Sequence, residues 1–221
     1  MSRADLAITI IDRSRAEEFS AWFEEHGIPM VLTVMGRGTA TTEILDCLGL
    51  EATEKAVLLC AAPHSPRMIR QAARDLWLDV PGRGILMTVP IHSIGGAAAK
   101  DYLLQQEAEE TMEKELTHEL IVVVANRGYT DMVMDAARAA GATGGTAIHA
   151  KGTGAELARK FFGVSIADEK EVILILTRVE DRKAIMKGIM NDAGMHTEAH
   201  ALVFSLPVSD LAGLRKAEQD A

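Results

Sequence analysis

The stretch "IVVVANRGYTDMVMDAARAAG" (residues 121–141) is similar to a stretch earlier in the chain, and this similarity indicates that the fold is built from two copies of one unit. It aligns without a gap with "AITIIDRSRAEEFSAWFEEHG" (residues 7–27) at an offset of 114, which places Arg127 on Arg13. In both stretches an apolar run typical of a buried strand precedes apolar residues at helical spacing, and both end on glycine. Each stretch therefore predicts a strand followed by a helix.

The internal match extends well beyond these two stretches. Further pairs follow in the same order at offsets of 114 to 117: "GRGT" (36–39) with "AKGT" (150–153), Gly49 with Gly163, "EKAVLL" (54–59) with "EKEVIL" (169–174), Arg67 with Arg182, and "PIHSIGG" (90–96) with "PVSDLAG" (207–213). Each pair is weak alone, but their order and nearly constant spacing indicate a tandem duplication.

Apolar runs and helical periodicity give each copy the same order of elements. In the second copy we expect strands at 120–125, 145–150, 171–177 and 200–206 and helices at 129–140 and 180–193. In the first copy we expect strands near 6–11, 30–35, 55–61 and 84–89 and helices near 15–26 and 66–78. The order βαββαβ predicts an α+β fold of tandem ferredoxin-like repeats, each an antiparallel sheet with two helices on one face.

The segment between the copies and the open sheet faces complete the expected organisation. Residues 97–116 contain no Gly or Pro and many helix-forming residues, which predicts a linking helix. We therefore divide the chain into a first repeat (1–98), a helical linker (99–117) and a second repeat (118–221).

Strands as apolar as "LIVVVA" (120–125) have two faces to bury, so we expect homo-oligomers that pack through their sheets, with a trimer favoured.

Composition narrows the classes of function. The formal net charge is -9 and Lys and Arg do not cluster, so we expect no nucleic-acid partner. The two cysteines, Cys47 and Cys60, lack zinc-type spacing and are expected to be buried free thiols of a reducing compartment. The short apolar run near residue 10 is neither a signal peptide nor a membrane span, so we expect a cytoplasmic protein that reaches membranes only through a partner.

The second copy resembles the PII-type nitrogen-regulatory signalling proteins. The resemblance rests on the strand and helix ending in "AGA", on "GGTAIHAKGTG", on "EKEVILILT" and on "RKAIMKGIM", and it covers most of 119–213 and, more faintly, 5–96. It implies trimers of ferredoxin-like units that regulate a partner protein in nitrogen metabolism. It also implies an adenine nucleotide (ATP, ADP or AMP) as effector, bound in clefts between units, with no other cofactor.

The resemblance also implies which residues meet the nucleotide. The base of the large loop would surround the phosphates, and here that base corresponds to Lys151, Gly152, Thr153 and Gly154. Glycines let backbone N–H groups face an anion, and a lysine adds positive charge. In the first copy Arg37, Gly38 and Thr39 take the equivalent places, so one copy could bind the ligand while the other is architectural.

The large loop itself contains a candidate partner-binding patch. Residues 156–162 are expected to form one or two helical turns closed by Gly163. Phe161 and Phe162 would then either dock a partner protein or pack on the body of the protein or a neighbouring subunit, and packing is the more frequent fate of large apolar residues.

No catalytic site stands out in the sequence. We find no Ser-His-Asp order, no G-x-S-x-G, no Cys-His pairing and no complete phosphate loop, so we expect a protein that is not an enzyme. His196 and His200 would lie about 13 Å apart on a strand, too far to share a metal ion. The preferred function is a PII-like regulatory protein, and the alternative is a structural or metal-binding trimer module like the CutA-like proteins, with His149 among the candidate ligands.

Overall fold

The computed structural model of the chain describes residues 4–28, 30–39, 54–80, 82–94, 116–152, 160–161, 164–165 and 168–214. The chain divides into two compact units. Unit 1 comprises residues 1–35, 54–117 and 207–221, and unit 2 comprises residues 36–53 and 118–206. Each unit is therefore built from segments of both halves of the sequence.

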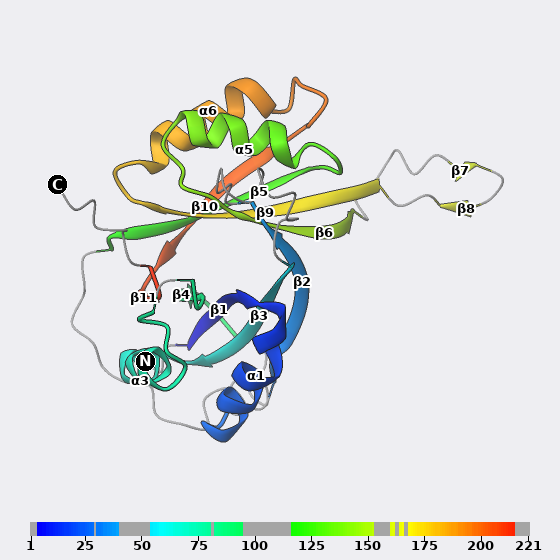
Figure 1. The fold of residues 1–221 in the computed structure, drawn as a ribbon. Coiled ribbons are helices and arrows are strands. Elements are labelled where there is room, and N and C mark those ends of the chain that lie inside the picture. Colours follow the sequence, from blue (N-terminus) through cyan, green and yellow to red (C-terminus); the bar gives the residue numbers. More distant parts are fainter. Residues whose placement is uncertain are drawn as a thin grey trace, which may run out of the picture. The chain divides into compact units, whose positions relative to one another are not determined.

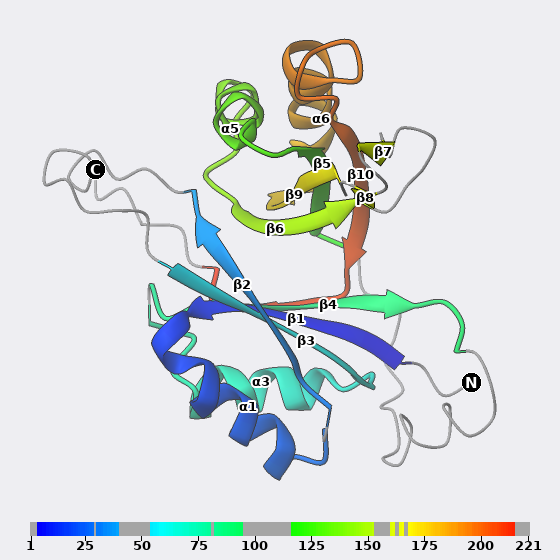
Figure 2. The ribbon, with the colours of Figure 1, turned by 90° about the vertical axis from the view of Figure 1, so that its right-hand side faces the viewer.

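Unit 1 is an antiparallel sheet with two helices on one face (Figure 2). Its elements are β1 (Ala4–Asp12), the 3-10 turn η1 (Arg13–Arg15), α1 (Ala16–Glu25), β2 (Leu32–Gly38), β3 (Glu54–Pro63), α3 (Pro66–Asp75), β4 (Ile85–Ile91) and β11 (Asp210–Ala212). The strands follow one another in the order β2-β3-β1-β4-β11. Helix α3 starts where the hydroxyl of Ser65 accepts a hydrogen bond from the N–H of Met68 and a proline occupies the first turn.

Unit 2 repeats this arrangement, with α5 and α6 side by side on one face of its sheet (Figure 1). Its elements are β5 (His118–Asn126), α5 (Thr130–Ala139), β6 (Thr146–Gly152), β7 (Lys160–Phe161), β8 (Val164–Ser165), β9 (Asp168–Arg178), α6 (Arg182–Ala193) and β10 (Leu202–Val208). The strand order is β10-β5-β9-β6, followed by the end of β2. Both units thus have the strand order of a ferredoxin-like fold, which confirms the expected βαββαβ repeats.

Alternation along the strands directs one set of apolar side chains under the helices of each unit. In unit 1 the core includes Ala7, Phe19, Phe23, Leu58 and Leu86, each fully excluded from solvent. In unit 2 the core is assembled from β5, β9 and the two helices: Ile121, Val123, Met134, Ile173, Ile175, Ile185 and Ile189. Cys60 lies in the unit 1 core, and this burial raises the pKa of its thiol to about 12.

Each sheet is extended by a strand that comes from the other half of the sequence. In unit 2, residues 36–38 pair antiparallel with residues 146–148 of β6. In unit 1, β11 pairs antiparallel with β4, where the N–H of Ser209 donates to the carbonyl oxygen of Thr88 over 2.8 Å. Gly213 has φ +89°, and a Cβ there would lie 2.0 Å from the carbonyl oxygen of Gly84. The close approach of β11 to β4 therefore requires a glycine at this position.

Two parts of the structure differ from the expectations. The helical turns expected in the large loop are wrong for Lys160 and Phe161, which form β7 and pair with Val164 and Ser165 of β8. Only two residues separate these strands in the sequence and one of them is glycine, a spacing that favours a tight β-hairpin over a helix end. Strand β11 was not anticipated either, because three residues between Ser209 and Gly213 give no clear periodicity. The expected linker helix at 97–116 lies almost entirely outside the described residues, as do Cys47 and Phe162.

Candidate functional site

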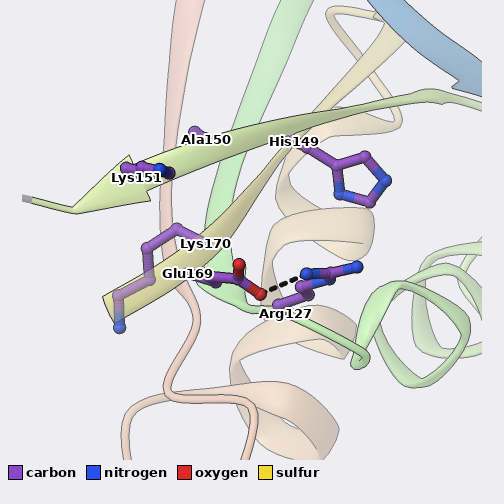
Figure 3. A pocket seen from close by; sticks show the side chains of 6 residues that line it. All are labelled: Arg127, His149, Ala150, Lys151, Glu169 and Lys170. Carbon is purple, nitrogen blue, oxygen red and sulfur yellow. Dashed lines mark hydrogen bonds and ion pairs between the residues drawn. The ribbon is translucent and has the colours of Figure 1, made fainter. Parts of the chain in front are cut away.

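A pocket with a volume of about 170 Å³ lies in unit 2 at the base of the large loop (Figure 3). Strand β6 enters the loop and β9 leaves it, and the pocket is found where these two strands lie beside the end of β5. The residues that line it are Arg127, His149, Ala150, Lys151, Glu169 and Lys170. Four of these six side chains carry nitrogen, which makes the lining suited to an anion.

The register between β6 and β9 places His149, Lys151 and Glu169 on one face of the sheet, whereas Lys170 belongs to the opposite face. His149 lies opposite Glu171 and Lys151 lies opposite Glu169. This is the face that α5 and α6 cover, because Ala147 precedes His149 by two residues and packs into the core under these helices. At the end of the sheet the helical cover ends and the same face opens to solvent.

Arg127 and Glu169 form an exposed ion pair at the floor of the pocket. Nη1 of Arg127 donates to Oε2 of Glu169, and the backbone N–H of Arg127 donates to the carbonyl oxygen of Glu169 over 3.1 Å. The hydrogen bond and the charge of Arg127 hold the pKa of Glu169 below its ordinary value, with smaller contributions from Lys151 and His149. The same contact raises the pKa of Arg127. Glu169 therefore stays ionised and partly neutralises Arg127.

Lys151 and Lys170 differ in their partners. Nζ of Lys170 donates to Oδ1 of Asn126 over 2.5 Å, and Figure 3 shows its side chain directed away from Arg127. Lys151 is exposed, and none of the carboxylates in the described part of the chain lies within ion-pair distance of it. Lys151 is thus the cation of this pocket that remains available to a ligand.

A buried carboxylate lies beneath His149. Glu171 is 6% exposed, and its Oε2 accepts hydrogen bonds from the hydroxyl of Thr130 over 2.6 Å and from the N–H of Gly128 over 3.2 Å. Nδ1 of His149 lies 3.5 Å from the other carboxylate oxygen, Oε1. Glu171 therefore fixes the start of α5 through these hydrogen bonds, and its other oxygen lies beside the imidazole of His149, which is itself largely exposed.

The residues expected to bind nucleotide are found in two separate places. Lys151 lines the pocket, and Gly152 ends β6 opposite Asp168. Thr153 and Gly154 lie outside the described residues, and for Phe161 only the backbone is described.

The equivalent residues of the first copy lie at the other end of β6. Arg37 pairs with Ala147 and Gly38 with Thr146, about 13 Å along the strand from Lys151. The hydroxyl of Thr39 donates to the carbonyl oxygen of Gly145 and accepts from its N–H, each over 2.8 Å. The structure therefore gives Thr39 a structural role and does not bring it to the pocket.

Sequence reasoning missed most of the pocket. Arg127, Glu169 and Lys170 were not proposed, and His149 was considered only as a metal ligand. The available signal was the internal match, which aligned Arg127 with Arg13 and "EKE" with "EKA". No group of three or more His, Cys, Asp or Glu side chains that could hold a metal ion is found within the described ranges. Likewise, no helix among the described elements is long and apolar enough to cross a membrane.

Comparison with protein families gives a match to part of the chain. Residues 118–218 match the family described as Nitrogen regulatory protein P-II. These residues, a little under half of the chain, are similar to the P-II family. The match begins with β5 and extends past β11, so it covers all the residues that line the pocket.

Solved structures of low similarity also match the chain. A PII protein from Arabidopsis thaliana, described as bound to citrate, is 17% identical and matches 43% of this chain and 79% of its own length with a TM-score of 0.34. A microcompartment protein from Desulfitobacterium hafniense DCB is 10% identical and matches 94% of this chain and 96% of its own length with a TM-score of 0.25. No curated protein matches the sequence.

Proposed function

We propose that the protein is a PII-like regulatory protein that binds a small anionic effector, an adenine nucleotide, at the loop base of unit 2. The observation that carries the proposal is the uncommitted ammonium of Lys151 at a pocket shared with Arg127 and His149. A volume of about 170 Å³ accepts a phosphate group or two rather than a whole nucleotide. The remaining contacts would come from the loop that continues from Gly152 through Thr153 and Gly154, whose backbone N–H groups can approach a phosphate closely.

The two copies would have unequal roles in this proposal. The second copy binds the effector, and the first copy supplies Arg37, Gly38 and Thr39 as an edge that supports β6. Two observations favour this division: residues 36–38 pair with β6, and Thr39 makes both of its described side-chain hydrogen bonds to Gly145. Binding at Lys151 would then act on the large loop directly, because β6 leads into that loop.

Effector binding would change the affinity of the large loop for a partner protein. Phe161 and Phe162 are the proposed partner-binding residues, and the hairpin β7–β8 presents this part of the loop. We further propose a cytoplasmic homo-oligomer, with a trimer favoured, that regulates its partner in nitrogen metabolism and is not an enzyme. The similarity of residues 118–218 to the family described as Nitrogen regulatory protein P-II supports this role.

Isothermal titration calorimetry of the purified protein with ATP, ADP and AMP tests the effector site. Tripolyphosphate and adenosine, titrated separately, show which part of the nucleotide is recognised. We expect Lys151→Ala to weaken nucleotide binding at least tenfold, because it removes the available cation. Arg37→Ala and Lys187→Ala are the matched controls, since each removes an exposed cation of unit 2 outside the pocket, and we expect less than a twofold change.

Two results would contradict the proposal. One is the absence of binding heat and of any melting-temperature shift with all three nucleotides at millimolar concentration. The other is a loss of affinity in Arg37→Ala as large as in Lys151→Ala. A parallel titration with divalent zinc and copper tests the metal-binding alternative, which predicts a metal-dependent rise in melting temperature and no response to nucleotide.

A further inference from the structure

Three helices of the protein end in the same hydrogen-bonded motif, but one of them ends differently in sequence. After α1 the N–H of Ile28 donates to Phe23, and after α5 the N–H of Ala142 donates to Ala137, each over 2.9 Å. After α3 the N–H of Leu78 donates to Ala73 over the same 2.9 Å. In this motif the residue before the donor adopts a left-handed conformation, for which glycine is best suited.

Trp77 occupies the position that glycine holds in the other two motifs. The left-handed residues are Gly27 with φ +78°, Gly141 with φ +104° and Trp77 with φ +56°. A residue with a Cβ is less stable in this conformation than glycine by about 1 kcal/mol. Its neighbour Leu78 is fully buried, whereas Trp77 is 65% exposed. Packing within unit 1 therefore does not account for a tryptophan at this position.

The exposed indole lies near one end of a row of arginines along α3. Arg67, Arg70 and Arg74 are exposed and are spaced three and four residues apart, which places them on one face of the helix. Trp77 lies two residues beyond the end of α3, after Asp75, and so near the Arg74 end of this row. None of the carboxylates in the described part of the chain lies within ion-pair distance of Arg70 or Arg74. The row is locally basic although the chain as a whole carries a net charge of -9.

The neighbouring helix of the same layer has the opposite charge. The exposed acidic residues of α1 are Glu17, Glu18, Glu24 and Glu25, of which Glu18 forms an ion pair with Arg15 over 2.9 Å. Both helices cover the same face of the unit 1 sheet (Figure 2), and two side-chain contacts join them: Nε1 of Trp22 donates to Oδ2 of Asp75 over 3.1 Å, and Gln71 Nε2 lies 3.0 Å from His26 Nε2. Trp22 contacts Asp75 and the later residue His26 contacts the earlier residue Gln71, so the two helices run antiparallel. The helix layer of unit 1 is therefore acidic along one side and basic along the other.

We propose that this helix layer docks onto the same layer of a second copy of the chain. In a two-fold arrangement α3 of each copy lies along α1 of the other, so the acidic side of one layer meets the basic side of its partner twice. Trp77, which is 65% exposed at the end of α3, serves as the apolar anchor of the interface.

The charge pattern argues for this occupant over two others. A nucleic acid or an anionic membrane would meet the arginine row of α3, but Glu17, Glu24 and Glu25 of the neighbouring α1 would repel the same surface. A second copy is attracted by both helices. The surface is also separate from the Lys151 pocket, so this inference does not rest on the proposed effector site.

Sedimentation velocity over a range of protein concentrations and salt tests the proposal with paired charge reversals. Arg70→Glu with Arg74→Glu makes both sides of the layer acidic, and Glu24→Arg with Glu25→Arg makes both sides basic. We expect each double variant to lose at least tenfold in self-association, and we expect their equimolar mixture to associate again. Lys183→Glu with Lys187→Glu on α6 is the matched control and keeps the wild-type behaviour.

The outcomes separate this interface from any assembly through the sheets. A sheet-mediated oligomer persists in every variant, so its mass forms the baseline from which the additional association is measured. A wild-type mass that is the same as that of the two double variants, or a mixture that fails to re-associate, overturns the proposal. Binding of the wild type to phosphatidylserine vesicles without any concentration-dependent mass would overturn it in favour of a membrane surface.

Replacement of Trp77 gives a second test, in which the melting temperature is expected to rise and self-association to weaken. Trp77→Gly places the best-suited residue in the left-handed position, so we expect a higher melting temperature at concentrations where the protein does not associate. The same substitution removes the anchor, so we expect at least tenfold weaker self-association. A lower melting temperature together with unchanged association would show that Trp77 serves only the fold of unit 1.

Discussion

The two units share an ion pair at the end of the sheet but differ in the buried residue that lies close to it in sequence. Arg13 pairs with Glu54 in unit 1 at 2.6 Å, and Arg127 pairs with Glu169 at the equivalent place in unit 2. Two residues after each glutamate, unit 1 has the fully buried Ala56 and unit 2 has the buried Glu171. The comparison teaches that the two units share the ion pair but differ in the residue beside it, which is apolar in unit 1 and a carboxylate in unit 2.

The partners of Glu171 explain why only unit 2 accommodates a buried carboxylate. Thr130 and Gly128 donate to it, and at an offset of 114 their places in unit 1 are taken by Ala16 and Ser14. Ser14 is already bonded, because its N–H and hydroxyl both donate to Oδ1 of Asp12. These hydrogen bonds lower the pKa of Asp12. Unit 1 thus closes the same turn locally and leaves no donor for a glutamate at position 56.

The largest expected effect comes from placing the unit 2 carboxylate into unit 1. Ala56→Glu should destabilise the protein by about 4 kcal/mol, because a fully buried site with no free donor receives a charge. Urea unfolding followed by circular dichroism measures the loss. Ala56→Leu, which adds a side chain of comparable length without charge, is the control for overpacking. Equal destabilisation by Leu and Glu would refute the electrostatic explanation.

The second effect concerns the added strands. Gly213→Ala should destabilise unit 1 by about 3 kcal/mol, because the new Cβ meets the carbonyl of Gly84 in a left-handed backbone conformation. Gly36→Ala in unit 2 should cause a smaller loss, since its Cβ would lie 3.0 Å from the carbonyl oxygen of Ala147 at a negative φ. Amide hydrogen exchange should show faster exchange in β4 only for Gly213→Ala. Unchanged protection of β4 would mean that β11 does not need this glycine.

A third effect comes from removing the buried carboxylate of unit 2. Glu171→Ala should destabilise the protein by about 2 kcal/mol, because it leaves the Thr130 hydroxyl and the Gly128 N–H without their acceptor. The double variant Glu171→Ala with Thr130→Val removes one donor as well and should recover part of the loss. Thermal unfolding of the two variants decides the matter, and identical melting temperatures would show that the hydrogen bond contributes little.

The smallest effect is a pH dependence of the exposed ion pair. The lowered pKa of Glu169 means that its favourable contact with Arg127 is fully present above the ordinary glutamate pKa and is lost as the pH falls through the lowered pKa. NMR titration of the Glu169 carboxyl carbon measures this pKa. Arg127→Gln should return it towards its ordinary value. Titration curves that coincide in the two proteins would exclude Arg127 as the cause.

The sequence predicted the strands and helices that show hydrophobic periodicity. It did not predict the features that depend on contacts between distant residues. The apolar runs of β5 and β9 and the helical spacing in α5 located the βαββαβ repeats in both copies. Strand β11 could not be predicted, because its place depends on pairing with β4 and on the contact of Gly213 with Gly84, 129 positions away in the chain. Similarly, Lys151 was found from the family resemblance, but its neighbours Arg127 and Glu169 meet it only through the register of three strands.

The pairing of each sheet with a strand from the other repeat has a consequence for any attempt to divide the protein. Expression of residues 1–98 alone would leave β4 with an uncovered edge, because β11 would be missing. Expression of residues 118–221 alone would uncover the edge of β6 in the same way. Such half-proteins would expose unpaired strand edges and would tend to aggregate. In the fused chain each of these edges is paired with a strand from the other repeat, which protects it from aggregation.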